Sequence, residues 1–317
     1  MTPEQADGAD GVVGLATERA VAAIVDADAT RDPETVRSVL DHVTDDGGRV
    51  SRDGIDETVS DVAKRLSTAE TRTELARSAF EDAAAAADGV DDLDVVSARL
   101  DRYEATLDDI DSRVRDLGAD LQAVSNPDDT PDAVYEAVCE LRRIAGEADD
   151  VQQTADELQF DLDDFEAWLD SHERRRQAFE EDVDVVADAL EAARTAATPP
   201  LDAESWVDAV LRVEVTPVLL ADLRAELDDL RAMAERAGVD GGWADDLEDR
   251  LADLDSRVAA ARAALNDAAE PSWRERYGAR IAAFRETGAA AEPPVEWGEV
   301  QAELDRARAL DEPYAPA

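Results

Sequence analysis

The apolar and small residues between positions 55 and 169 recur at steps that alternate between four and three residues. The alternation is unbroken in three runs, which extend from Ile55 to Ala83, from Leu93 to Val124 and from Val134 to Leu169. A mean step of about 3.5 residues is the repeat of a coiled coil, in which two positions of each heptad face a partner helix. The chain is therefore expected to be all-α, with long antiparallel helical hairpins or a coiled-coil bundle and shorter C-terminal helices.

Two short polar segments separate the three runs. Residues 88–91 connect the first two runs, and residues 125–131 connect the second and third, with Thr130 as helix N-cap and Pro131 as the first helical residue. The helices from about 52 to 88 and from 92 to 125 would each be about 50 Å long. Because so short a connection joins them, they are expected to fold back on each other as an antiparallel hairpin.

The third run can be interpreted in two ways beyond Leu169. Its phase continues into Phe179 and Val183, which favours one continuous or kinked helix from residue 131 to about 197. The polar residues from Ser171 to Gln177 favour a turn near Asp170 and Ser171 instead. We expect the continuous or kinked helix, because the phase is unbroken.

A proline-containing break over residues 197–200 divides the chain most clearly, because proline ends helices. We therefore predict three domains. Residues 1–50 would form a small helical N-terminal cap, and residues 51–197 a long coiled-coil hairpin or bundle. Residues 198–317 would form a second helical bundle with a loose C-terminal tail.

The charge of the chain constrains its environment. Asp and Glu total 79 against 32 Lys and Arg, which gives a formal net charge of -47, and Lys64 is the only lysine. Such a charge opposes a compact state at ordinary ionic strength, but at 1 M salt the screening length is only about 3 Å. We therefore expect a halophilic protein of a salt-rich, haloarchaeal-type cytosol. No apolar run approaches a membrane span, and the N-terminus lacks a signal-peptide pattern, so a cytoplasmic location without membrane insertion is expected.

Motifs that carry catalytic chemistry are missing from the sequence. Lys64 does not follow glycines as the lysine of a phosphate-binding loop would, and no Gly-x-Ser-x-Gly or His-Glu-x-x-His pattern occurs. The only cysteine, Cys139, and the two distant histidines, His42 and His172, do not have the spacing of a zinc site. No catalytic residue, metal, cofactor or small-molecule substrate is predicted, and the protein is expected not to be an enzyme.

Two locally basic clusters stand out against the acidic background. The first consists of His172, Arg174, Arg175 and Arg176. The second consists of Trp273, Arg274, Arg276, Tyr277 and Arg280. Arginine mixed with aromatic residues can contact an acidic partner or nucleic acid, so these residues are the candidate partner contacts. In the alternative interpretation, which we favour, the apolar residues from Trp273 to Phe284 form the buried stripe of an amphipathic helix and the arginines surround it.

Four stretches of the chain resemble a haloarchaeal family known as halo transducer proteins. They are residues 67–76 (STAETRTELA), 116–123 (DLGADLQA), 151–159 (VQQTADELQ) and 220–227 (LADLRAEL). The likeness covers most of residues 30–236. It implies kinship to archaeal sensory transducers, which signal through long helical hairpins, and it assigns no individual functional residue.

Taken together, the heptads and the missing catalytic motifs predict a non-catalytic coiled-coil scaffold or interaction protein, associated with signalling. Its expected partner is a protein, either a second copy of this chain or another coiled coil. The alternative hypothesis is a nucleic-acid-associated helical protein that uses the arginine-aromatic helix near residues 273–285. The strongly acidic charge makes a nucleic-acid partner the less favoured of the two.

Overall fold

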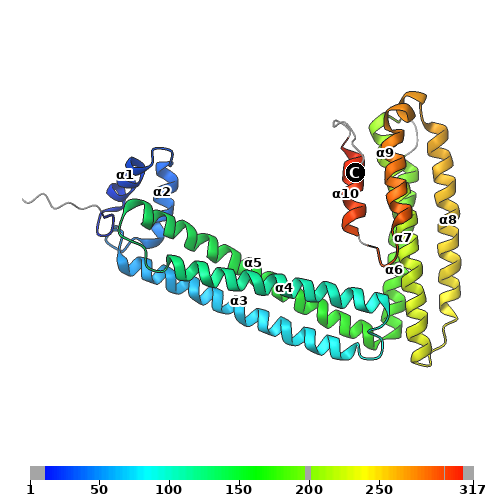
Figure 1. Ribbon diagram of the computed structural model, residues 1–317, viewed down its shortest axis with the longest axis horizontal. Helices are drawn as coiled ribbons and strands as arrows, with labels where there is room; N and C mark the ends of the chain where they lie inside the picture. Colours follow the sequence, from blue (N-terminus) through cyan, green and yellow to red (C-terminus); the bar gives the residue numbers. More distant parts are fainter. Residues whose placement is uncertain (1–10, 197–200, 296, 310–317) are drawn as a thin grey trace, which may run out of the picture. The chain divides into compact units, whose positions relative to one another are not determined.

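The computed structural model describes residues 11–196, 201–295 and 297–309, and in these residues the fold is all-α without any strand, as predicted. The chain forms two compact units (Figure 1). Unit 1 takes the residues up to Ala85 together with Asp101–Asp164, and unit 2 takes Ala86–Leu100 together with the residues from Phe165 onward. Both units contain parts of the long helices, because those helices continue from one unit into the other.

The N-terminal part of unit 1 is a small cap made of α1 (Thr17–Ala27), α2 (Pro33–Leu40) and one 3-10 turn (Asp41–Val43). The Asp32 carboxylate caps α2 by accepting a 2.8 Å hydrogen bond from the backbone N–H of Thr35. Two isolated β-bridges join Ala16 to Arg49 and Thr44 to Val50. The apolar side chains of the cap pack on the first turns of two long helices. This cluster consists of Val12, Ala20, Val21, Ile24, Val36, Val39, Leu40, Val43, Val50, Ile55, Val134 and Val138.

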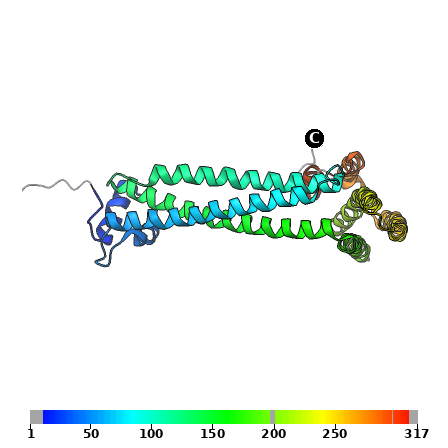
Figure 2. The same cartoon turned by 90° about the horizontal axis from the view of Figure 1, so that it is seen from below.

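The rest of unit 1 consists of most of three long helices, namely α3 (Arg52–Ala86), α4 (Asp94–Val124) and α5 (Pro131–Asp170). Figures 1 and 2 both show them side by side. The interhelical ion pairs are Arg77–Asp111, Arg143–Asp120, Arg65–Asp149 and Arg72–Asp156. The last two pairs advance together along α3 and α5, so these two helices run in the same direction and α4 runs opposite to them. The predicted runs supply the buried residues at the centre, for example Leu66, Ile110 and Ile144.

The helix that begins at Pro131 does not continue to residue 197, and this expectation was wrong. α5 ends at Asp170, and α6 (His172–Ala196) begins after Ser171. Ser171 caps the new helix, because its hydroxyl accepts a 3.2 Å hydrogen bond from the backbone N–H of Arg174. Arg175 is 6% exposed and donates from Nη1 to the carbonyl oxygens of Trp168, at 2.9 Å, and Leu169. The buried guanidinium thus satisfies the last carbonyls of α5, which would otherwise be unpaired at a helix end.

Unit 2 is organised around α7 (Ala203–Arg236), which contacts α6, α8 (Trp243–Ala268), α9 (Pro271–Ala290) and α10 (Trp297–Arg308). Its sequence is apolar on nearly all sides between Trp206 and Leu220. A helix that is hydrophobic all round has to be covered all round. The four neighbouring helices provide this cover, so α7 is the core helix of the unit.

The compact units are divided differently from the predicted domains. Residues 11–50 share unit 1 with the long helices, and residues 165–196 share unit 2 with the helices that follow them. The reason is that α6 packs on α7. The predicted break over residues 197–200 and the predicted loose tail over residues 312–317 lie outside the described residues.

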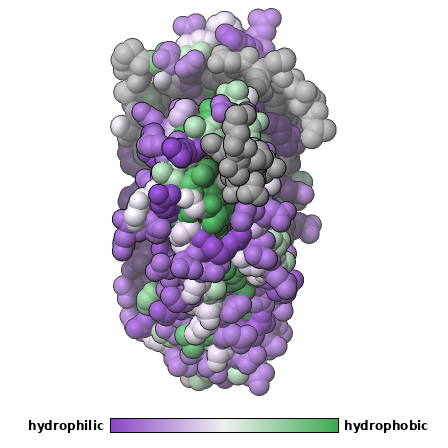
Figure 3. All heavy atoms as spheres, turned by 90° about the vertical axis from the view of Figure 1, so that its left-hand side faces the viewer, coloured by the Kyte–Doolittle hydropathy of each residue, from purple (hydrophilic) through white to green (hydrophobic). Residues whose placement is uncertain are grey.

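The face seen in Figure 3 is predominantly hydrophilic. Within the described ranges, no helix combines the length and the apolarity needed to cross a membrane. The same residues contain no group of three or more His, Cys, Asp or Glu side chains arranged to hold a metal ion.

Candidate functional site

The first predicted basic cluster lies at the junction of α5 and α6. Arg175 is buried in the junction, and Arg176 forms ion pairs with Glu173 at 3.0 Å and Glu180 at 3.7 Å. The His172 ring lies 5.3 Å from the ring of Trp243, centroid to centroid. Arg174 is the exposed arginine of the cluster. In this cluster, Arg175 therefore joins α6 to the end of α5, Arg176 forms its ion pairs within α6, and His172 lies against α8.

The second predicted cluster lies on α9, where the buried-stripe interpretation is confirmed. Tyr277, Ile281 and Phe284 are buried, and Trp273 is half-buried with its ring 6.0 Å from that of Trp206. Arg280 is also buried, and its Nη1 donates to the carbonyl oxygens of Ala309 at 3.0 Å and Ala307 at 3.4 Å, at the end of α10. Tyr277 and Arg280 are thus parts of the packing of unit 2, and the nucleic-acid hypothesis loses two of its proposed contacts.

Arg274 and Arg276 are the exposed arginines of the second cluster, and they have different surroundings. Arg276 lies over the ring of Tyr277, 5.1 Å from its centroid. Arg274 donates from Nη2 to the carbonyl oxygens of Asn266 and Ala269, the latter at 3.0 Å, at the C-terminal end of α8. Cationic side chains are favourable at that end of a helix. Arg274 also lines a cavity between α7, α8 and α9.

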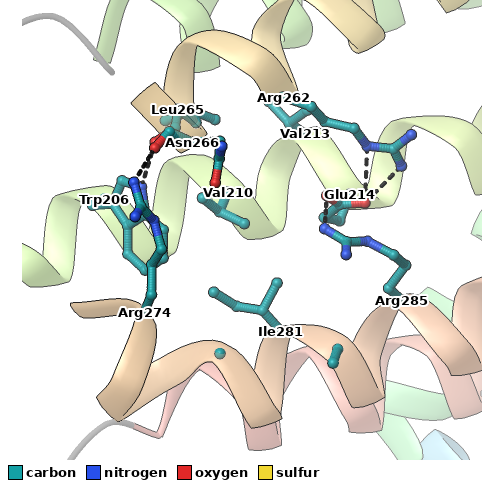
Figure 4. A pocket seen from close by; sticks show the side chains of 12 residues that line it. Trp206, Val210, Val213, Glu214, Arg262, Leu265, Asn266, Arg274, Ile281 and Arg285 are labelled. Atoms are coloured by element: carbon teal, nitrogen blue, oxygen red, sulfur yellow. Dashed lines mark hydrogen bonds and ion pairs between the residues drawn. The ribbon is translucent and has the colours of Figure 1, made fainter. Parts of the chain in front are cut away.

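This cavity has a volume of about 240 Å³ and is partly open to solvent (Figure 4). Its lining combines aliphatic side chains with charged residues. The lining residues are Trp206, Val210, Val213, Glu214, Arg262, Leu265, Asn266, Arg274, Gly278, Ile281, Ala282 and Arg285. All of them belong to unit 2, and α7, α8 and α9 each contribute several.

Glu214 lies at one end of the cavity, with its side chain only 2% exposed. Its Oε2 accepts hydrogen bonds from Arg262 Nε at 3.1 Å and Nη2 at 2.6 Å, and its Oε1 accepts one from Arg285 Nη2 at 2.6 Å. Burial alone would raise the pKa of Glu214, but the hydrogen bonds from Arg285 and Arg262 outweigh it, and the pKa lies below its ordinary value. The carboxylate is therefore ionised and already paired.

The two ends of the cavity are separated by apolar side chains. Figure 4 shows Trp206 and Arg274 at one end, Glu214 with its two arginines at the other, and Val210 and Ile281 between them. The Trp206 indole Nε1–H donates to the Leu265 carbonyl oxygen at 2.9 Å, which fixes the ring against α8. The lining contains three arginines and one glutamate, an excess of two positive charges, in a chain whose net charge is -47.

Sequence reasoning identified Arg274 but not Glu214, Arg262 or Arg285. A signal for Glu214 was present, because this glutamate lies between Val213 and Val215 in a mostly apolar stretch from Val210 to Val218, which also contains Arg212 and Thr216. An acid at such a position must be buried with a partner or lie where the run is exposed. Its two arginine partners lie on other helices, so no spacing in the sequence could assign them.

A second feature of the surface lies in unit 1, on α3 and α5. Phe160 of α5 is 70% exposed and Leu75 of α3 is 49% exposed. The ion pair between Arg72 and Asp156 joins the same two helices at 3.3 Å. Leu75 follows Arg72 by three residues and Phe160 follows Asp156 by four, so each lies one turn further along the same helix face. The two exposed apolar side chains therefore lie at about the same level of the parallel α3 and α5 helices.

Comparison of the chain with protein-family models, with curated proteins and with solved structures finds no match.

Proposed function

We propose that this protein is a non-catalytic helical scaffold that binds another protein through the α3–α5 face of unit 1, in a salt-rich cytosol and in association with signalling. The observation that carries the proposal is the exposure of Phe160 and Leu75 at about the same level of two neighbouring helices. Large apolar side chains exposed singly are common on soluble proteins, and we propose that these two together form one contact surface along the groove between α3 and α5.

The residues around this apolar pair indicate which kind of partner it binds. Acidic residues surround it, among them Glu74 on α3 and Glu157 and Asp161 on α5. In molar salt their charge is screened within about 3 Å, so it neither attracts nor repels a partner over distance. Contact between apolar surfaces is not weakened in this way. The partner that fits is therefore a helix with its own apolar stripe, from a second copy of the chain or from another protein.

The supporting architecture is a long and regular pair of helices. The repeated ion pairs between α3 and α5, at 2.5 Å for Arg65–Asp149 and 3.3 Å for Arg72–Asp156, keep the two helices in register on either side of the groove. Such pairs contribute little stability each at the surface. Their effect here is to hold the two apolar side chains at a constant separation, as a docking groove for a helix requires.

A pair of substitutions tests the proposal. The variant Leu75→Ser with Phe160→Ser removes the apolar pair, and Val185→Ser, at a residue of α6 that is 67% exposed, is the matched control outside this groove. Self-association is measured by light scattering in 2 M KCl, and binding of other proteins by affinity capture from a high-salt lysate. We expect the double variant to lose a complex that the wild type and the control both form. A complex unaffected by the double variant would overturn the proposed contact surface.

A further inference from the structure

The cavity between α7, α8 and α9 lies in unit 2 and plays no part in the scaffold function proposed for unit 1. We infer that it is a binding site for a small organic carboxylate with a short apolar body. Three features of the cavity support this ligand: the charge of its lining, its apolar wall and the glycine at position 278.

The charge of the lining selects an anion. Glu214 is already paired with Arg262 and Arg285, so its negative charge is neutralised without a bound cation. Within the residues that the structure describes, the Nη1 groups of Arg262 and Arg285 have no protein acceptor. Both guanidiniums are reachable from solvent, with side chains 40% and 55% exposed. A guanidinium presents its N–H donors in a planar fork that matches a carboxylate.

The middle of the cavity selects an apolar body on that anion. Val210 and Ile281 lie between the two charged ends (Figure 4), and Ala282 is a further aliphatic residue of the lining. A compact inorganic anion would leave these aliphatic groups in contact with water. A ligand that covers them gains about 25 cal/mol for each Å² of apolar surface removed from water, and this gain persists in molar salt. Long-range electrostatic attraction does not persist in molar salt, because the screening length at 1 M salt is only about 3 Å.

Gly278 keeps the cavity open. It lies in the interior of α9, where glycine is less favourable than alanine because it loses more conformational freedom on folding. A Cβ at this position would have no heavy atom within 4 Å, so packing does not require the glycine. Since Gly278 lines the cavity, together with Ala282 one turn later, a larger side chain here would occupy the space itself.

The volume sets an upper limit on the ligand. About 240 Å³ is at the small end for ligand pockets, which usually span about 300–1,000 Å³. A short aliphatic or monocyclic carboxylate fits this limit, whereas a nucleotide or a long lipid chain would extend out of the cavity. Hexanoate is therefore a suitable probe.

The test uses isothermal titration calorimetry on the full chain in 2 M KCl, with hexanoate, hexanol, hexylamine and inorganic phosphate as probes. We expect saturable binding of one hexanoate per chain, weaker binding of hexanol, and no binding of hexylamine or phosphate. Saturable phosphate binding equal to that of hexanoate would overturn the assignment of a carboxylate with an apolar body. The absence of saturable hexanoate binding at millimolar concentration would overturn the site itself.

Three variants locate the binding. Gly278→Leu fills the cavity while favouring the helix, so it is expected to abolish binding with unchanged helical circular dichroism. Arg285→Gln removes a charged donor at the rim and should weaken binding about tenfold or more, since hydrogen bonds to charged groups are the stronger ones. Arg276→Gln alters an exposed arginine of the same helix outside the lining and should change nothing. Hexanoate binding retained in a folded Gly278→Leu variant would exclude this cavity, whatever the outcome for the α3–α5 groove.

Discussion

Glu214 and Glu226 are both on α7, and their pKa values are displaced in opposite directions. Burial raises the pKa of each carboxyl. At Glu214 the hydrogen bonds from Arg285 and Arg262 overcome that effect, and the pKa is lowered. At Glu226 the ion pair with Arg99, at 3.2 Å, does not overcome it, and neighbouring acids raise the pKa further. As an anion, Glu214 therefore stabilises the folded protein, whereas Glu226 destabilises it.

Neutralising the two glutamates in turn should separate these effects. Glu214→Gln is expected to lower the free energy of unfolding by about 1–2 kcal/mol at pH 7, because it removes a carboxylate that two partly exposed arginines contact. Glu226→Gln is expected to leave that free energy unchanged or to raise it by up to about 1 kcal/mol, since it removes a poorly compensated buried charge. Urea unfolding in 2 M KCl measures both. Equal losses in the two variants would contradict the prediction.

The same two residues predict opposite dependences of stability on pH. The ordinary pKa of a glutamate is 4.5, and the folded pKa of Glu214 lies below it. Its contribution is therefore present above pH 4.5 and is lost as the pH falls through the folded value. The folded pKa of Glu226 lies above 4.5, so its protonation favours the folded state, and this contribution is lost as the pH rises through the folded value.

Unfolding measured at several pH values from about 7 down to about 4 should show both trends as differences from the wild type. The loss caused by Glu214→Gln should shrink toward acidic pH. The gain caused by Glu226→Gln should shrink as well, because the wild-type Glu226 becomes neutral there. A Glu214→Gln loss that stays constant over the whole range would show that the pKa of Glu214 is the same in the folded and the unfolded protein.

The junction of α5 and α6 provides a prediction about a buried arginine. Arg175→Ala removes the donor to the carbonyl oxygens of Trp168 and Leu169, and is expected to cost about 1–3 kcal/mol of unfolding free energy. Arg174→Ala, at the exposed neighbour, is the control and should change the value by less than about 0.5 kcal/mol. Hydrogen exchange of the last turn of α5 should become faster in Arg175→Ala only. Similar exchange in both variants would show that the hydrogen bonds from Arg175 are not needed to protect the last turn of α5.

The long helices of unit 1 were predictable because their heptad repeat is a local property of the sequence. The buried residues Leu66, Ile110 and Ile144 are members of the predicted runs. The end of α5 was not predictable in the same way. The apolar phase from Leu162 to Phe179 suits a continuous helix, and the break depends on a hydrogen bond from Arg175 to carbonyls more than one turn before it.

The cavity could be predicted even less from the sequence. Arg274 was identified because it lies beside Trp273 and Tyr277 in the chain. Glu214, Arg262 and Arg285 come from three different helices, and they meet only because α8 and α9 both pack on α7. Periodicity shows which face of each helix is buried, but it does not show which helices are neighbours.

The net charge of -47 predicts that folding depends on salt. The 79 acidic side chains outnumber the 32 basic ones, so their mutual repulsion should grow as the salt concentration is lowered. We expect the helical circular dichroism signal to fall between molar and millimolar KCl, and to return when KCl is added back, because the screening length shortens from about 30 Å at 0.01 M to about 3 Å at 1 M. Sucrose stabilises proteins by exclusion from their surface rather than by screening, so sucrose at matched osmolality should restore less of the signal. A helical signal that is unchanged in millimolar KCl would show that the ion pairs between helices, such as Arg65–Asp149, compensate the repulsion without added salt.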